Sequence, residues 1–206
     1  MRRLLIISTI TVLFAGIIFS QDEGRKGSVC TDESVSQISS RGIKVGSKLD
    51  EVLNFFAANS EEKEKIRRNF SGPSRKYLGY EFFSAQPRPD ASATNTQFEG
   101  ISSYVFTFWD ERLSGFGVTY SKPKWEDSRQ FAAKMAEFFA LPVVEAWSQQ
   151  NGRLSLNCGN YIIYAEVQGD GSSFTVSDSR LGKLLAERKV KYDKDQREAD
   201  LKTFKP

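Results

Sequence analysis

The spacing of the apolar residues restricts what this chain can fold into more than any other feature, because it alternates between helical and strand periods. Leu49, Val52, Leu53 and Phe56 follow one another at i, i+3, i+4 and i+7, which is typical of an amphipathic helix with one buried stripe. A more polar helical stretch begins near residue 59. From residue 125 helical spacing returns and places four apolar side chains together: Phe131, Met135, Phe138 and Phe139.

Strand alternation, with a period of two, fills the rest of the chain. It predicts three strands at residues 77–84, 98–109 and 113–120, and three more at residues 153–158, 161–167 and 173–177. The turns within each set are short, so neighbouring strands are expected to be antiparallel. We therefore predict an α+β fold in which two successive helix-plus-antiparallel-meander units pack as one domain over residues 41–180.

The first residues have the order of an export signal. Two arginines precede an uncharged, mostly apolar run that ends near residue 20, and such a run is short for a membrane span. Residues 1–20 are predicted to be a signal peptide, residues 21–40 a flexible lead-in and residues 181–206 a charged tail. The alternative is an uncleaved N-terminal anchor, which would be the chain's one contact with the membrane. Both readings place the domain outside the cytosol, in the periplasm or secreted.

Two cysteines, Cys30 and Cys158, lie near the start of the exported part and in a late strand. Exported chains tolerate disulfides, and an unpaired thiol in an oxidising compartment is a liability. We expect these cysteines to pair. The alternative is a buried Cys158 with a free thiol at Cys30.

Charge and composition exclude several classes of function. The net charge is +3, but the tail from residue 180 carries an excess of positive charge and residues 21–179 are slightly acidic, so nucleic-acid binding is not expected. The chain contains no histidine, which removes histidine-activated nucleophiles and histidine-ligated zinc. No cofactor or metal is predicted.

The catalytic candidates are weak. Ser121 and Lys124 have the Ser-x-x-Lys spacing of penicillin-recognising enzymes, but Pro123 lies between them and no Lys-Thr-Gly partner motif follows. Three strand carboxylates could in principle form a glycosidase pair: Glu81, Glu99 and Glu166. Nothing in the sequence brings them together, and no aspartates follow a calcium-loop pattern. We assign no catalytic residue.

The long hairpin is the better candidate for binding. Its first strand alternates Tyr104, Phe106 and Phe108 with a second face that holds Trp109, while one face of its second strand is nearly bare at Gly115 and Gly117. Such a bare face is either solvated, covered by a closely packed helix, or a surface that a partner approaches. Exposed aromatic residues are typical interface anchors, and the predicted partner-binding residues are Tyr104, Phe106, Trp109 and Tyr120.

Residues 42–52, GIKVGSKLDEV, resemble the opening of the small exported domains grouped around the outer-membrane assembly lipoprotein BamE and the β-lactamase inhibitory protein. Residues 104–120 are similar to the central hairpin of their meander. The acylated cysteine of the lipoproteins has no counterpart directly after the signal, and the loop at residues 85–96 is long. The resemblance implies a binding or scaffolding module and transfers no site residues.

We therefore expect an exported, non-enzymatic binding or scaffolding protein of the bacterial cell envelope. Its partner would be an envelope protein or a cell-wall component. The alternative is an envelope hydrolase or transferase that uses carboxylates or Ser121.

Overall fold

The computed structural model describes residues 29–68, 78–86 and 98–204. The expected signal at residues 1–20 lies outside the described residues, as do residues 21–28 of the expected lead-in.

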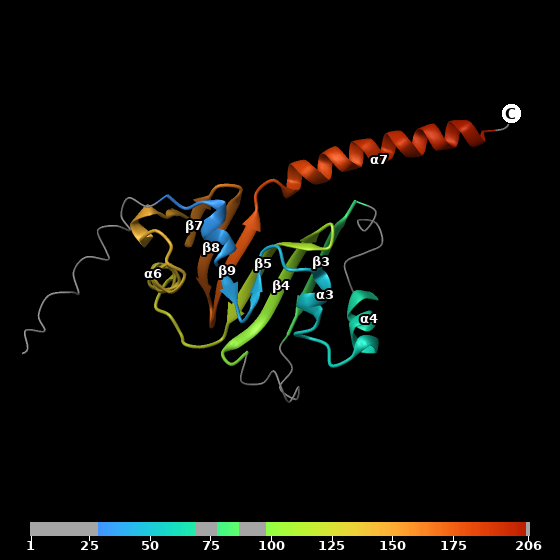
Figure 1. Ribbon diagram of the computed structural model, residues 1–206. Helices are drawn as coiled ribbons and strands as arrows, with labels where there is room; N and C mark the ends of the chain where they lie inside the picture. The colour runs from blue at the N-terminus through green and yellow to red at the C-terminus, as the bar shows by residue number, and fades with distance from the viewer. Residues whose placement is uncertain (1–28, 69–77, 87–97, 205–206) are drawn as a thin grey trace, which may run out of the picture.

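The described strands form one large antiparallel sheet with the order β3-β4-β5-β9-β8-β7-β6 (Figure 1). Its strands are β3 Tyr80–Ala85, β4 Ile101–Trp109, β5 Arg112–Tyr120, β6 Ser148–Gln150, β7 Arg153–Cys158, β8 Tyr161–Gln168 and β9 Gly171–Asp178. Apart from the short edge strand β6, all of them were predicted from strand alternation. The α+β class is confirmed.

The two predicted meanders share this sheet. β5, the last strand of the first meander, pairs with β9, the last strand of the second, through Phe116 opposite Val176 and Val118 opposite Phe174. All four of these side chains are buried. Because residues directly opposite in antiparallel strands point to the same face, the apolar face of one meander continues directly into that of the other.

Five helices flank the sheet among the described residues, together with a two-stranded sheet and one 3-10 turn. They are α2 Asp32–Ser36, α3 Leu49–Leu53, α4 Ser60–Arg68, α6 Ser128–Phe138 and α7 Leu181–Thr203, with β1 Ser39–Ser40, β2 Ile43–Lys44 and η1 Val144–Ala146. Local capping explains where two of them begin. Asn59 accepts a hydrogen bond from the Glu62 amide at the start of α4, and Asp127 accepts one from the Gln130 amide at the start of α6.

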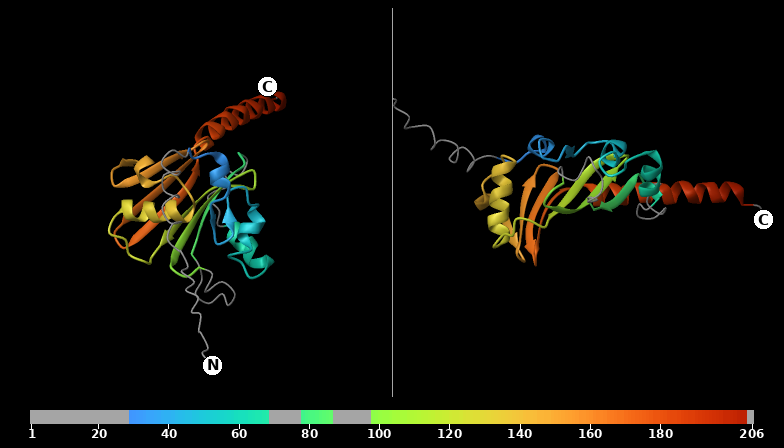
Figure 2. Two further views of the ribbon diagram at one scale, coloured as in Figure 1. Left: turned by 60° about the vertical axis from the view of Figure 1, so that its left-hand side comes forward. Right: turned by 90° about the horizontal axis from the view of Figure 1, so that it is seen from below.

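One face of the sheet carries the core. At the β3–β5 end, the Phe56 ring just after α3 packs against Tyr104, Phe106 and Phe83. At the other end, Phe139 just after α6 stacks on Phe174. In the right-hand view of Figure 2 the N-terminal segment and α3 lie along one side of the sheet. Helices from both halves of the chain thus cover the same face.

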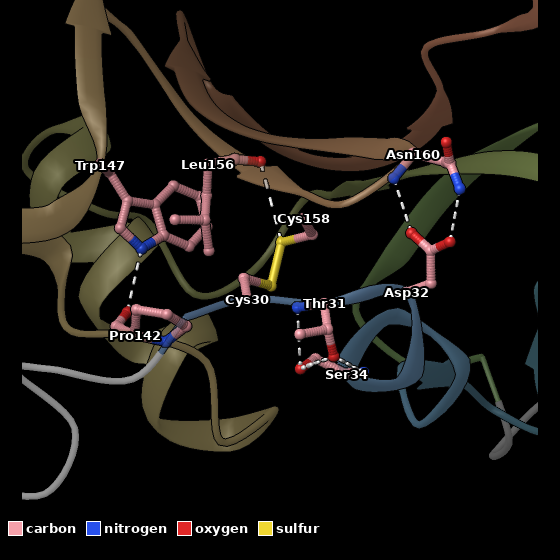
Figure 3. Close-up of a disulfide and its surroundings, with 9 residues drawn as sticks. All are labelled: Cys30, Thr31, Asp32, Ser34, Pro142, Trp147, Leu156, Cys158 and Asn160. Atoms are coloured by element: carbon pink, nitrogen blue, oxygen red, sulfur yellow. Dashed lines mark hydrogen bonds between the residues drawn. A yellow bond between two sulfur atoms is a disulfide. The ribbon is translucent and has the colours of Figure 1, made fainter.

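The segment from Cys30 to residue 40 is ordered, which differs from the flexible lead-in expected there. Cys30 is bonded to Cys158 of β7 (Figure 3), so the predicted disulfide is present. Thr31 caps α2 by accepting a hydrogen bond from the Ser34 amide, and Val35 and Ile38 are completely buried. The serine-rich composition concealed two apolar anchors that belong to the core.

The expected charged tail is likewise one long helix, α7, up to Thr203. Three lysine-carboxylate pairs at i,i+4 support it: Lys183–Glu187, Lys189–Asp193 and Lys194–Glu198. Figure 1 shows α7 leaving the end of β9 and extending past the β3 edge of the sheet. The charged segment is therefore a solvated helix with no buried residue.

Candidate functional site

No helix in the described part of the chain covers the second face of the sheet. On this face, which we call the open face, stand the side chains that alternate with the core residues: Val105 and Thr107 of β4, Thr119 of β5, and Ser173, Thr175 and Ser177 of β9. All of them are half-buried or exposed. Because no described helix lies over it, this face is the candidate docking surface.

The open face is hollowed over three adjacent strands, β4, β5 and β9. The hollow has a volume of about 270 Å³, and no charged residue is among the described residues that line it. The lining residues are Val105, Thr107, Gly115, Phe116, Gly117, Val118, Thr119, Ser173, Thr175, Val176 and Ser177. Since Phe116, Val118 and Val176 turn their side chains to the core, they contribute main chain to the floor.

Two glycines of β5 line the hollow. A Cβ at Gly117 would lie 3.1 Å from the Thr175 hydroxyl and 3.8 Å from the Val105 Cβ, so it would enter the space between these neighbours. A Cβ at Gly115 would lie 2.7 Å from the Val176 carbonyl oxygen, which leaves no room for a side chain. Glycine inside a strand often marks a place where another backbone or ligand approaches closely.

An arginine stacked on an aromatic ring flanks the hollow on each side. On β7, the Arg153 guanidinium lies 3.6 Å from the centre of the Tyr164 ring, and Arg153 Nε is 3.9 Å from Glu166 Oε2. Beyond β4, the Arg188 guanidinium of α7 lies 4.1 Å from the centre of the Trp109 ring. In such cation–π contacts the guanidinium is attracted to the face of the ring.

Arg188 also fixes α7 to the sheet. Its two terminal nitrogens donate to the two carboxylate oxygens of Asp110, in the turn after β4, and one of them donates to the Leu78 carbonyl at 2.9 Å. These hydrogen bonds lower the pKa of Asp110 and raise the pKa of Arg188. α7 is thereby anchored at one end of the open face.

Three of the four aromatic residues predicted to bind a partner lie on the core face of the sheet. Tyr104 and Phe106 are completely buried under the N-terminal segment, so neither can contact a partner in the folded protein. Tyr120 packs against Phe131 of α6 on the same side. Trp109 alone shares the open face, at its rim, and it is half-buried. The alternation separated the two faces correctly but did not show which of them the helices cover.

A polar cluster connects the small sheet to the core. Ser40 Oγ and the Tyr104 hydroxyl are 2.9 Å apart, and Ser40 also contacts Tyr120. Burial raises the pKa of Tyr104 to about 12 and also raises the pKa of Tyr120. Because these hydroxyls are enclosed, the cluster orders the fold and offers no surface to a substrate.

The structure does not assemble the catalytic candidates. Ser121 donates to the Gly100 carbonyl, and Lys124 pairs with Asp170 at 2.7 Å instead of approaching Ser121. That hydrogen bond raises the pKa of Lys124, so its amine is protonated and cannot take a proton from Ser121.

The strand carboxylates are equally unsuited to joint catalysis. Glu81 lies on β3 and Glu166 on β8, with three strands between them, a separation of about 19 Å at the usual strand spacing. Glycosidase pairs are at most about 10 Å apart. Glu81 also points to the core face and Glu166 to the open face. Nowhere in the described ranges do three potential metal-binding side chains meet.

The chain matches no protein-family model, no curated protein and no solved structure. A search of the described helices for one that is long and apolar enough to cross a membrane found none.

Proposed function

We propose that this chain is an exported, non-enzymatic binding protein of the bacterial cell envelope and that its partner docks on the open face of the sheet. The observation that carries the proposal is the uncharged hollow over β4, β5 and β9. A concave surface with few charges, on a sheet face that no described helix covers, has the properties of an interface centre, where charged residues are depleted.

Three features support export. Residues 1–20 have the charge and apolar pattern of a signal, and the Cys30–Cys158 disulfide suits an oxidising compartment. The resemblance of residues 42–52 to exported binding and scaffolding domains points to the same class.

The position of the hollow also suits a binding role. We interpret the chain as two helix-plus-meander units, and the hollow lies on the seam between them, because β4 and β5 come from the first unit and β9 from the second. Clefts at the junction of two structural units are common binding sites. The partner would be an envelope protein or a cell-wall component.

The test is a comparative pull-down. The mature chain from Gln21, a Thr175→Lys variant and a Phe138→Lys variant are each immobilised, incubated with the native envelope fraction and analysed by mass spectrometry. Thr175 lines the hollow, whereas Phe138 is 72% exposed on α6, so the second lysine is a matched control. We expect one stoichiometric partner that the Thr175 variant loses and the Phe138 variant keeps. Equal retention by both variants would refute docking on the open face.

A further inference from the structure

A guanidinium group occupies a composite site at one end of the sheet, and the body of the domain supplies that site. The two terminal nitrogens of Arg188 donate to the two carboxylate oxygens of Asp110, and one of them also donates to the Leu78 carbonyl oxygen at 2.9 Å. The same guanidinium lies 4.1 Å from the centre of the Trp109 ring. A carboxylate that accepts two hydrogen bonds, beside a ring face, matches the features that distinguish arginine from lysine.

The backbone around this site leaves room for the guanidinium. Gly79 has a φ of +73°, and an added Cβ there would lie 2.2 Å from Asp110 Oδ1 and 2.3 Å from a terminal nitrogen of Arg188. Asp110 and Glu111 are also left-handed, with φ values of 48° and 60°, which is uncommon for residues other than glycine. The Asp110 amide donates to the Gly79 carbonyl at 2.8 Å and ties the two segments together. Backbone strain of this kind clusters at functional sites.

The arginine that fills the site comes from a helix that adds no side chain to the core. α7 has no buried residue, and each of its residues from 193 to 203 is exposed. The side chains of Arg188 and Asp110 are 38% and 53% exposed even while they are paired, and ion pairs as exposed as this one contribute little net stability. Release of Arg188 therefore removes no side chain of α7 from the core, and the Asp110 carboxylate can be approached from solvent.

We propose that Leu78, Trp109 and Asp110 form an arginine-binding site, that Arg188 fills it as an internal ligand, and that an arginine side chain of a protein partner replaces Arg188 on docking. The last part rests on the proposed function. Because Trp109 stands at the rim of the open face, a partner on that face lies beside the site. α7 is thereby an autoinhibitory arm, since its own arginine lowers the apparent affinity for a partner's arginine in proportion to the fraction of molecules whose site it fills.

The site itself is tested by titration of the isotope-labelled Arg188→Ala chain, followed by the indole N–H resonance of Trp109 and the backbone amide of Gly79. The probes are N-acetyl-argininamide and N-acetyl-lysinamide, which carry the same charge. We expect saturable shifts with the arginine probe and binding several-fold weaker with the lysine probe, because an ammonium group lacks the planar fork that pairs with a carboxylate. Equal or tighter binding of the lysine probe, or no shift with either probe, would overturn the inference.

Further variants show whether Arg188 and the probe compete. The wild type and Arg197→Ala both keep Arg188 and should bind the arginine probe several-fold more weakly than Arg188→Ala. Arg188→Gln is a second open variant, so the test survives if the alanine variant folds poorly. Adding Asp110→Asn to Arg188→Ala removes the carboxylate charge, while asparagine also tolerates left-handed backbone, and it should abolish the shifts. Binding to the wild type as tight as to the open variants would refute the role of Arg188 as an internal ligand.

The replacement of Arg188 by a partner's arginine is tested in the envelope pull-down. Arg188→Ala should retain several-fold more of the partner than the wild type, and the added Asp110→Asn change should cancel that gain. Equal retention by all three chains would refute the replacement. If the arginine probe binds but Thr175→Lys retains the partner, the arginine site exists and the proposed docking face is wrong. If Thr175→Lys loses the partner but the probe does not bind, the docking face stands and the arginine site is wrong.

Discussion

Asp32 accepts two hydrogen bonds from Asn160, one from the backbone amide and one from the side-chain amide, both at 2.6 Å (Figure 3). Asp32 opens α2 and Asn160 lies in the turn between β7 and β8, next to the Cys30–Cys158 disulfide. A covalent bond and a two-point hydrogen bond therefore hold the N-terminal segment against the second meander, while its later residues reach the first. The segment connects the two ends of the core face.

Removing the disulfide should destabilise the whole domain. Cys30 and Cys158 are separated by 128 positions, and a native disulfide that closes a long loop contributes typically about 2–5 kcal/mol. We expect the double variant Cys30→Ser, Cys158→Ser to lose a free energy of unfolding of that size in urea denaturation. Reductant should lower the stability of the wild type and leave the double variant unchanged. Equal stability of both proteins without reductant would show that the bond does not constrain the fold.

The Asp32–Asn160 contact should make stability fall in acid. The hydrogen bonds from Asn160 hold the pKa of Asp32 below its ordinary value of 3.8. A carboxyl whose pKa is lowered by folding stabilises the protein above its unfolded pKa and loses that contribution as the pH falls through the folded pKa. Asp32→Asn should therefore be less stable than the wild type at neutral pH, with the gap closing below about pH 4. A gap of constant size in thermal melts across this range would contradict the assignment.

The Tyr104 hydroxyl should make the stability of the protein fall at high pH, the opposite of the effect of Asp32. Burial raises its pKa from 10.0 to about 12, so its contribution is present below pH 10 and is lost as the pH rises towards 12. The variant Tyr104→Phe should cost about 1 kcal/mol at neutral pH through the lost Ser40 contact. Ultraviolet titration of tyrosinate should show one fewer late-titrating tyrosine in this variant. An unchanged titration curve would mean that Tyr104 is not the protected group.

Local patterns in the sequence predicted most of the fold. Strand alternation located β4, β5, β7, β8 and β9, because side chains two apart share a face and the apolar residues record which face is buried. The disulfide followed from the expectation that the two cysteines of an exported chain would pair. These features depend on neighbouring residues or on simple pairing, and they need no knowledge of tertiary packing.

The features that were missed depend on packing between distant segments. Val35 and Ile38 are only two apolar residues in a serine-rich stretch, so composition hid their place in the core. The aromatic face of β4 looked like an interface because alternation does not show where the helices lie. The sequence showed that the Gly115 and Gly117 face of β5 is bare. Thr175 and Ser177 of β9 complete the hollow on that face. The pairing of β5 with β9 joins strands that are far apart in the sequence, so local patterns could not predict it.

Cutting the Arg188 contact should release α7 from the end of the open face. In Arg188→Ala the helix loses its hydrogen bonds to Asp110 and Leu78 and its stacking on Trp109. We expect faster hydrogen exchange in residues 181–192 and a change in tryptophan fluorescence. Arg197→Ala, further along the same helix, is the control and should leave both measurements unchanged. Wild-type exchange in Arg188→Ala would show that α7 is held by other contacts.

The most direct test of the account is site-specific photo-cross-linking in the native envelope. A photoreactive phenylalanine analogue is placed at Val105, on the open face, and in a separate protein at Phe138, on α6; the two side chains are 37% and 72% exposed. The account predicts one adduct of defined mass from position 105 and no such adduct from the more exposed position 138. The same adduct from both positions, or an adduct from position 138 alone, would contradict docking on the open face.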